Sequence, residues 1–285
     1  MKKPSLFLRF SSLKMIIIII FIIILILLSA TAFNSDLTIK NHEVTSSKFE
    51  TDESIRIILI ADLHSHIYGE NQSALIAKIK DQKPDIILLA GDIAEDEVPI
   101  NGTKLLLNGI KDICPVFYVS GNHEYWSGDI KNIKEIIRSY GVVVLEDEFY
   151  EIDVDGVPII IAGVDDPEWI NYENKDLKPS MDENFKELDE KNQYKILLAH
   201  RPELIESYKK YSFDLVVSGH AHGGQIRIPF VLNGLYAPNQ GWFPKYAGGI
   251  YQHDNLIHII SRGISNNLQI PRIFNPPEIV VVDIK

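Results

Sequence analysis

Two histidines separated by one residue, His220 and His222, stand among glycines in the segment SGHAHGGQ (218–225). The segment follows an apolar run, FDLVV (213–217), whose composition is typical of a buried strand and not of a surface loop. Imidazole is a ligand that zinc, iron and manganese all accept. Neighbouring glycines let the backbone turn tightly beside bound ions: Gly219, Gly223 and Gly224. The motif therefore predicts that both histidines bind metal.

Asp, Asn or His also follows four other apolar runs of strand length. These residues are Asp62 and His64 after 55–61, Asp92 after 85–90, Asn122 after 116–120, and His200 after 194–199. The carboxyl ends of strands line the ligand crevice of an open α/β sheet, so we expect these side chains to converge. Each of them alone is compatible with a helix cap, a turn or a hydrogen-bonded core histidine. Their joint occurrence at five strand ends favours a metal site.

The seven residues offer more ligands than one tetrahedral ion takes. They suit two divalent metal ions that share one carboxylate and a water or hydroxide. Because imidazole and carboxylate bind Mn, Zn and Fe alike, the sequence does not choose among these metals. The predicted cofactor is thus a pair of divalent ions of unspecified identity.

Short runs rich in isoleucine and valine predict the strands that position these ligands. The runs are 55–61, 85–90, 116–120, 158–163, 194–199, 214–218, 256–261 and 278–284. Apolar periodicity predicts helices over 71–82 and 129–141. Alternating helices and apolar strands indicate an α/β domain with sheets buried on both faces, and the closely spaced later runs predict a second, more antiparallel sheet. We expect a two-sheet sandwich flanked by helices.

The N-terminal 33 residues predict either a transmembrane anchor or a signal peptide. Residues 15–28 contain no polar side chain, and the segment 15–33 is long enough to cross the roughly 30 Å hydrocarbon core of a bilayer. Lysines and an arginine precede it and no acid stands before Asp36, so the rest of the chain is expected outside the cytoplasm. A single-pass protein of the cell membrane is one interpretation. A secreted protein is the other, since ATA (30–32) resembles a cleavage site.

Composition limits the partners of the remaining chain. Residues 34–53 are polar and without periodicity, which predicts a linker to a folded domain at 54–285. Residues 34–285 contain 24 basic and 39 acidic residues, a net charge of −15. Such a surface repels polyanions, which excludes double-stranded nucleic acid as an expected partner. The single cysteine, Cys114, excludes an internal disulfide framework.

The motifs DLH, GD, GNHE, the histidine of AHRP and GHAH occur in the order and spacing of the calcineurin-like metallophosphoesterases. The chain resembles this family from about residue 55 onward, and its last portion is similar to a membrane-anchored or exported bacterial branch. The resemblance implies an α/β/β/α sandwich that hydrolyses phosphate esters. It assigns one metal ion to Asp62, His64, Asp92 and His222, and the other to Asp92, Asn122, His200 and His220. His66 is an additional histidine, and Ala221 replaces a threonine of many relatives.

The resemblance also implies a mechanism, in which a metal-bridging hydroxide attacks phosphorus. Catalytic roles then fall to Asp92, Asn122 and His123, with His123 as proton donor oriented by Glu124 or Asp62. We expect a phosphodiester or pyrophosphate substrate that belongs to the envelope or is lipid-linked. Two alternatives are a general phosphodiesterase acting on wall polymers or soluble nucleotides, and a non-catalytic metal-binding scaffold.

Three residues outside the motifs are candidates for substrate binding. Trp169 is placed to stack on a substrate, or else belongs to a solvated helix and loop. Arg227 and Lys245 lie in an aromatic segment, 225–249, that forms either an apolar lip for a lipid-linked phosphate or an ordinary edge of the core. In the first case these two bases would meet the headgroup.

Overall fold

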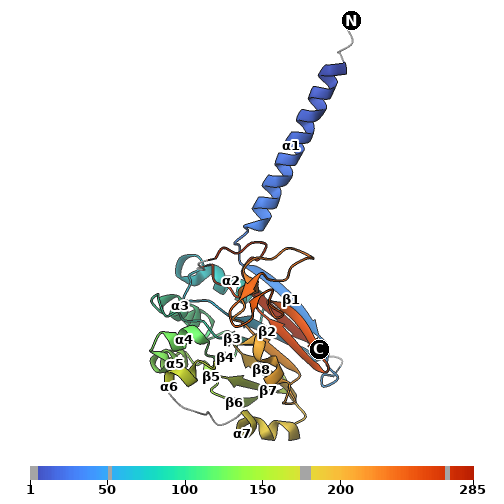
Figure 1. Ribbon diagram of the computed structural model, residues 1–285. Coiled ribbons are helices and arrows are strands. Elements are labelled where there is room, and N and C mark those ends of the chain that lie inside the picture. Colours follow the sequence, from blue (N-terminus) through green and yellow to red (C-terminus); the bar gives the residue numbers. More distant parts are fainter. Residues whose placement is uncertain (1–5, 51–52, 174–180, 267–269) are drawn as a thin grey trace.

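The computed structural model of the chain describes residues 6–50, 53–173, 181–266 and 270–285. Two six-stranded sheets pack against each other, and helices cover their outer faces (Figure 1). A long N-terminal helix, α1 (Leu6–Ala32), projects from one end of this domain. The predicted α/β/β/α sandwich of two mixed sheets is confirmed.

The first sheet contains both the earliest and the last strands of the chain. Its strands, in spatial order, are β1 (Thr38–Val44), β14 (Glu278–Ile284), β2 (Ile55–Ile60), β3 (Ile86–Ala90), β4 (Val116–Val119) and β5 (Val143–Val144). Neighbouring strands run parallel except for β14 and β2, which are antiparallel with Val282 opposite Ile57. The carboxyl ends of β2, β3 and β4 therefore meet at one edge of this sheet.

The second sheet is parallel in its centre and antiparallel at both edges. Its strands, in spatial order, are β12 (Gly249–His253), β13 (Leu256–Ile260), β9 (Leu215–Ser218), β8 (Tyr194–Ala199), β7 (Val157–Val164) and β6 (Glu148–Val154). Only the β12–β13 and β6–β7 pairs are antiparallel. A separate two-stranded ribbon consists of β10 (Tyr236–Ala237) and β11 (Gly241–Trp242).

Short helices cover the sheets. The α-helices of the domain are α2 (Ser73–Asp81), α3 (Asn101–Ile110), α4 (Asn122–Trp126), α5 (Ile130–Ser139), α6 (Trp169–Glu173), α7 (Met181–Phe185) and α8 (Ile205–Tyr208). Single 3-10 turns occur at Glu70–Gln72, Lys186–Glu190, Pro202–Leu204 and His222–Gly224. Figure 1 shows α2, α3 and α5 together on one side of the molecule, and α7 at the end remote from α1.

The period of two along each strand divides the apolar residues between layers. In β2, Ile55, Ile57 and Leu59 point into the core between the sheets, whereas Ile58 and Ile60 pack under α2, α3 and α5. A third apolar cluster lies between the second sheet and α7 and α8. Because both faces of each sheet are covered, the central strands need apolar side chains on both faces, and their sequences are continuous apolar runs. All eight predicted strands and both predicted helices are present.

The structure departs from the predicted linker at 34–53. Residues Thr38–Val44 form β1, which pairs in parallel with β14 along its whole length. This strand is an edge strand with one partner, so most of its side chains are exposed or half-buried and its sequence is polar. Apolar periodicity therefore could not reveal it, and the folded domain begins closer to α1 than predicted.

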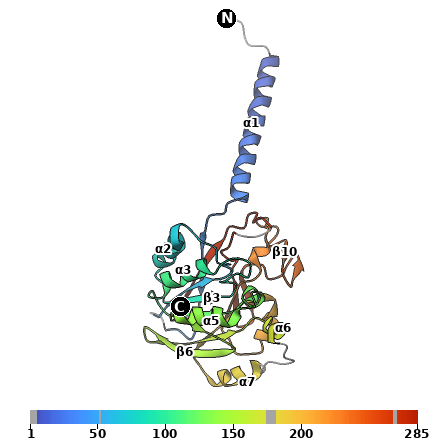
Figure 2. The same ribbon diagram turned by 90° about the vertical axis from the view of Figure 1, so that its left-hand side faces the viewer.

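The N-terminal helix stands apart from the domain in both views (Figures 1 and 2). Its segment Lys14–Ala32 is long and apolar enough to span a bilayer, and the side chains of residues 15–31 are exposed. Ala32 is the first buried residue after this exposed stretch, and its carbonyl accepts a hydrogen bond of 2.7 Å from the Phe274 backbone N–H. The helix thus joins the domain directly at Ala32.

Candidate metal centre

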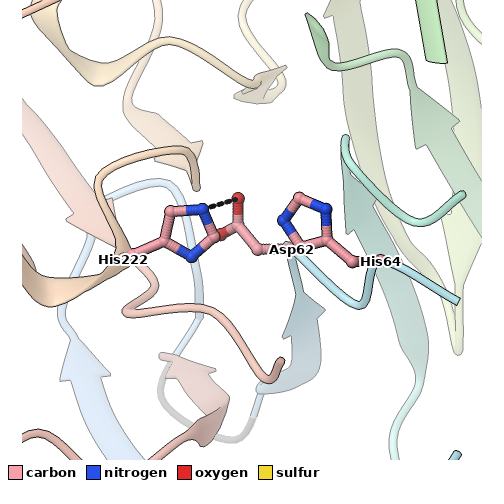
Figure 3. A group of neighbouring side chains, drawn as sticks. All are labelled: Asp62, His64 and His222. Atoms are coloured by element: carbon pink, nitrogen blue, oxygen red, sulfur yellow. Dashed lines mark ion pairs between the residues drawn. The ribbon is translucent and has the colours of Figure 1, made fainter. Parts of the chain in front are cut away.

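Side chains from both sheets converge where the predicted strands end. Asp62, His64 and His222 form one group of ligand atoms that all lie within 4.8 Å of one another, and Asp92, His200 and His220 form another. Figure 3 shows the Asp62 carboxylate between the rings of His64 and His222. The Asp62 Oδ1–His222 Nε2 distance is 3.8 Å. All six residues are buried, so the fold brings six of the seven predicted ligand residues together.

Asp92 lies between the two groups. Its Oδ2 atom is 3.1 Å from Nε2 of His200 and 3.9 Å from Nε2 of His64, while its Oδ1 accepts the backbone N–H of His123 at 2.9 Å. Asp92 thus lies close to a histidine of each group, a position compatible with a bridging ligand.

Several buried polar atoms of the site have no hydrogen-bond partner among the described residues. They are His64 Nε2, Asp92 Oδ2, Asn122 Oδ1, His200 Nε2 and His222 Nδ1. Buried polar atoms without a partner are rare because desolvation is costly, and a group of them facing one another indicates an ion. Imidazole nitrogens, carboxylate and amide oxygens are ligands of Mn, Zn and Fe, so the residues present fit two divalent ions.

In two of these histidines, His64 and His200, the other ring nitrogen has a partner of its own. Nδ1 of His64 lies 2.5 Å from Glu95 Oε2, and Nδ1 of His200 donates to the carbonyl of Ala90 at 2.7 Å. The remaining ring nitrogens are the ones without partners, and this is the arrangement that fixes the tautomer of a metal ligand.

In His220 the roles of the two ring nitrogens are exchanged, because here Nε2 has the hydrogen-bond partner. Its Nε2 lies 2.8 Å from Asn239 Oδ1, which also accepts from Arg201 Nη1 at 2.6 Å. An amide oxygen only accepts, so the proton is on His220 Nε2 and Nδ1 is left for metal. Neither Asn239 nor Arg201 was predicted: no strand end or motif marks Asn239, and Arg201, although it stands in AHRP beside His200, carries a positive charge that does not suggest a role at a metal site.

Burial and charge set the protonation of the ligands. Burial lowers the pKa of His220 and His222 well below the ordinary value, so both rings are neutral and able to bind metal. Burial also raises the pKa of Asp62 to about 6. His200 is different: although burial opposes its charge, Asp92 raises its pKa to about 10. Asp92 therefore stabilises positive charge where a cation would bind.

Five of the ligand residues adopt a left-handed backbone conformation, which is uncommon for residues with a side chain. Their φ angles lie between 46° and 67°: Asp62, His64, Asp92, His220 and His222. Gly121 is required by close approach, since a Cβ there would lie 2.2 Å from Asp92 Oδ1. Strained backbone of this kind concentrates at functional sites, where it aims side chains at a common point.

Glu124 of the GNHE motif connects two ligand loops. Its buried carboxylate accepts four backbone N–H groups, with Oε1 bound to those of Ile93 and Ala94 and Oε2 to those of Asp92 and Gly121. The distances lie between 2.7 and 3.0 Å. Glu124 thus fixes the loop after β3 against the loop after β4.

Substitution Glu124→Gln is expected to lower the free energy of unfolding by about 2–4 kcal/mol. The amide group replaces one oxygen, so two buried backbone N–H groups lose their acceptor and face another donor. Chemical denaturation of the purified chain measures the change, with the exposed Glu135→Gln on α5 as the matched control. Equal midpoints for the two variants would contradict this role of Glu124.

His123 lies beside the ligands and is held by carboxylates. Its Nδ1 is 2.6 Å from Asp96 Oδ1 and 3.0 Å from Glu95 Oε1, and its ring packs edge-on against that of His64. The expectation that Glu124 or Asp62 orients it is wrong, because the Glu124 carboxylate is occupied by backbone N–H groups. Burial opposes a charged ring, but Glu95, Asp92 and Asp96 raise the pKa of His123 to about 10.

The remaining predicted residues lie apart from the ligand groups. Trp169 is buried in a small cluster with Tyr125 and Ile130, which leaves little of its ring for stacking on a substrate. Lys245 is exposed, with its ammonium 4.9 Å from the centre of the Tyr246 ring.

Arg227 and His66 contact neither ligand group in the hydrogen bonds and ring contacts of the described residues. Arg227 lines a cavity of about 410 Å³ beneath the turn at 228–232. His66, the additional histidine, packs edge-on against Tyr68.

Comparisons with known proteins find a matching family model and related chains. The family model described as calcineurin-like phosphoesterase matches residues 55–224. An uncharacterized metallophosphoesterase of Helicobacter pylori strain J99 is 31% identical over 233 residues, which cover 80% of this chain and 59% of that protein. The match thus spans less than two thirds of the Helicobacter protein. The protein YpbG of Bacillus subtilis strain 168 is 33% identical over 198 residues, which cover 67% of this chain and 70% of YpbG.

A solved structure shows the same fold at low sequence identity. The sulfate thiohydrolase SoxB of Thermus thermophilus has a TM-score of 0.51 and 11% identity, and the match covers 80% of this chain and 56% of SoxB. At this identity the likeness concerns the fold alone.

Proposed function

The chain belongs to the calcineurin-like phosphoesterase family, and from this premise we propose that it hydrolyses phosphodiester or pyrophosphate bonds of an envelope substrate. The observation that carries this proposal is the position of Asp92 Oδ2, which lies without a hydrogen-bond partner between His200 Nε2 and His64 Nε2. A buried carboxylate oxygen in this position would be stabilised by a metal cation on each side. The intact ligand set favours an enzyme over a non-catalytic scaffold.

The residues would hold two divalent ions as the two ligand groups suggest. Asp62, His64 and His222 belong to one ion, His200, His220 and Asn122 to the other, and Asp92 to both. When bound, such ions activate water as a nucleophile near neutral pH and neutralise phosphoryl oxygens.

The chain itself supplies the proton for the leaving group. His123 is held through Nδ1 by Glu95 and Asp96, so its Nε2 is the nitrogen available to donate to the leaving oxygen. Glu95 also holds His64, and the proton donor and one metal ligand are therefore positioned by the same carboxylate. A shared carboxylate suits a reaction in which the attacking nucleophile and the leaving group must lie in line with phosphorus.

The N-terminal helix supports an envelope location. Basic residues precede the span at Lys14–Ala32, which favours a domain outside the cytoplasm and close to the bilayer surface. A catalytic domain held there meets lipid-linked phosphates at high local concentration. We therefore propose a lipid-linked substrate, with wall polymers or soluble nucleotides as the alternative.

Metal content and activity of the full chain in detergent test the enzyme proposal. We expect close to two metal ions per chain and hydrolysis of bis-p-nitrophenyl phosphate that is lost on chelation and restored by Mn or Zn. A chain without metal and without activity under every ion would favour the scaffold. Hydrolysis of lipid-linked phosphates in nanodiscs that exceeds hydrolysis of soluble esters supports the lipid substrate, and the reverse preference contradicts it.

A further inference from the structure

The turn at 228–232, with the sequence IPFVL, exposes apolar side chains at its tip. Ile228 and Leu232 exchange two backbone hydrogen bonds, which closes the turn and leaves Phe230 108% and Val231 80% exposed. Phe230 also has a φ of 65°, in the left-handed region that bulky residues avoid. Turns of this kind normally carry polar residues, and a run of apolar residues at the tip indicates a contact surface.

Backbone contacts place this turn at the end of the domain where α1 enters. The N–H of Arg227 donates to the Ile273 carbonyl at 2.9 Å, and the next residue, Phe274, donates to the carbonyl of Ala32 at the end of α1. Figures 1 and 2 show α1 leaving the domain at a single end, and β10, which follows the turn, lies near that end in Figure 2. A bilayer that contains α1 therefore faces the turn.

Arg227 supplies a cation beneath the apolar tip. It lines the cavity of about 410 Å³ together with Arg262, Phe274 and residues 228–233. Arg262 binds the Glu278 carboxylate, whereas the described part of the chain offers the guanidinium of Arg227 no carboxylate or carbonyl in hydrogen-bond contact. Burial and the neighbouring Arg262 lower its pKa. A half-buried guanidinium without an anion in hydrogen-bond contact is suited to bind a phosphate group from outside.

We propose that the turn at 228–232 is a second membrane contact of this protein, in addition to α1. Phe230 and Val231 enter the apolar layer, and Arg227 binds the phosphate of a phospholipid headgroup. The inference rests on the proposed membrane anchor, because α1 defines where the bilayer lies. Two contacts prevent the domain from rotating about the anchor. Since Arg227 follows the ligand His222 by five residues, the contact also fixes the orientation of the metal centre toward the membrane.

A fluorophore at the tip of the turn tests this contact in the full chain. Phe230→Cys in a Cys114→Ser background is labelled with NBD and reconstituted in nanodiscs of phosphatidylcholine and phosphatidylglycerol in equal parts. We expect blue-shifted emission and several-fold stronger quenching by doxyl-labelled lipids than for the control Tyr150→Cys. Tyr150 is an exposed aromatic residue of β6, remote from α1. Aqueous emission at both positions would overturn the proposal.

Two further experiments test the role of Arg227 in this contact and the membrane insertion of α1 separately. Arg227→Gln in the labelled chain is expected to lower the quenching at position 230, and unchanged quenching would overturn the headgroup contact. Carbonate extraction of the nanodiscs tests α1 itself. A chain removed by carbonate would overturn the anchor and with it the position of the turn, whereas a retained chain with aqueous emission would overturn the turn contact alone.

Discussion

Substitution Asp92→Asn is expected to lower phosphodiester hydrolysis by about 10³-fold or more and to reduce bound metal below one ion per chain. The substitution preserves shape, and the amide oxygen still accepts the backbone N–H of His123 that Asp92 Oδ1 accepts now. Its NH₂ group then takes the place of Oδ2, facing Nε2 of His64 and of His200. A hydrogen-bond donor stands where the shared negative ligand stood.

The measurement compares metal content and turnover of Asp92→Asn with those of Glu97→Gln. Glu97 is an exposed acidic residue on the same loop, so its substitution removes one charge nearby and leaves the ligands intact. Metal content and turnover close to those of the unmodified chain are expected for this control. Two tightly bound ions in Asp92→Asn would show that the two groups of ligands bind metal without a bridging carboxylate.

The candidate ligands of the two groups could be located from the sequence because each one lies within four residues of the end of an apolar run. His200 directly follows the strand Tyr194–Ala199, and Asp92 is the second residue after Ile86–Ala90, so the end of a strand in the sequence is the edge of a sheet in space. The order of strands in each sheet was not predictable. The last strand, Glu278–Ile284, lies between β1 and β2, and nothing in its apolar composition specifies these partners.

The residues that orient the ligands were missed for a physical reason. Glu95 and Asn239 act through contacts with the far side of an imidazole ring, and their positions follow no period. Their loops reach the site because backbone angles near Asp92 and Asn239 are left-handed, which Asp and Asn tolerate but do not require. Glu95 shows the consequence: it is one of many acidic residues until the fold brings it to His64 and His123.

Substitution His123→Ala is expected to preserve both metal ions and to lower turnover of substrates with poor leaving groups by about 10²–10⁴-fold. An alkyl phosphodiester needs a proton on its leaving oxygen, whereas nitrophenolate departs without one. Hydrolysis of bis-p-nitrophenyl phosphate should therefore fall much less. Metal content and the ratio of the two rates are the measurements.

Comparison with Glu95→Gln separates proton donation from metal binding. Glu95 contacts both His64 and His123, so its substitution should weaken metal binding about 10- to 100-fold and also slow turnover with alkyl esters. His123→Ala should slow the alkyl esters far more than the nitrophenyl ester and leave metal binding unchanged. The atoms of His64, Glu95 and His123 are close enough to form a ligand group of their own, so metal loss in His123→Ala would identify His123 as a ligand. Retained metal with a leaving-group-dependent loss of rate identifies it as the acid.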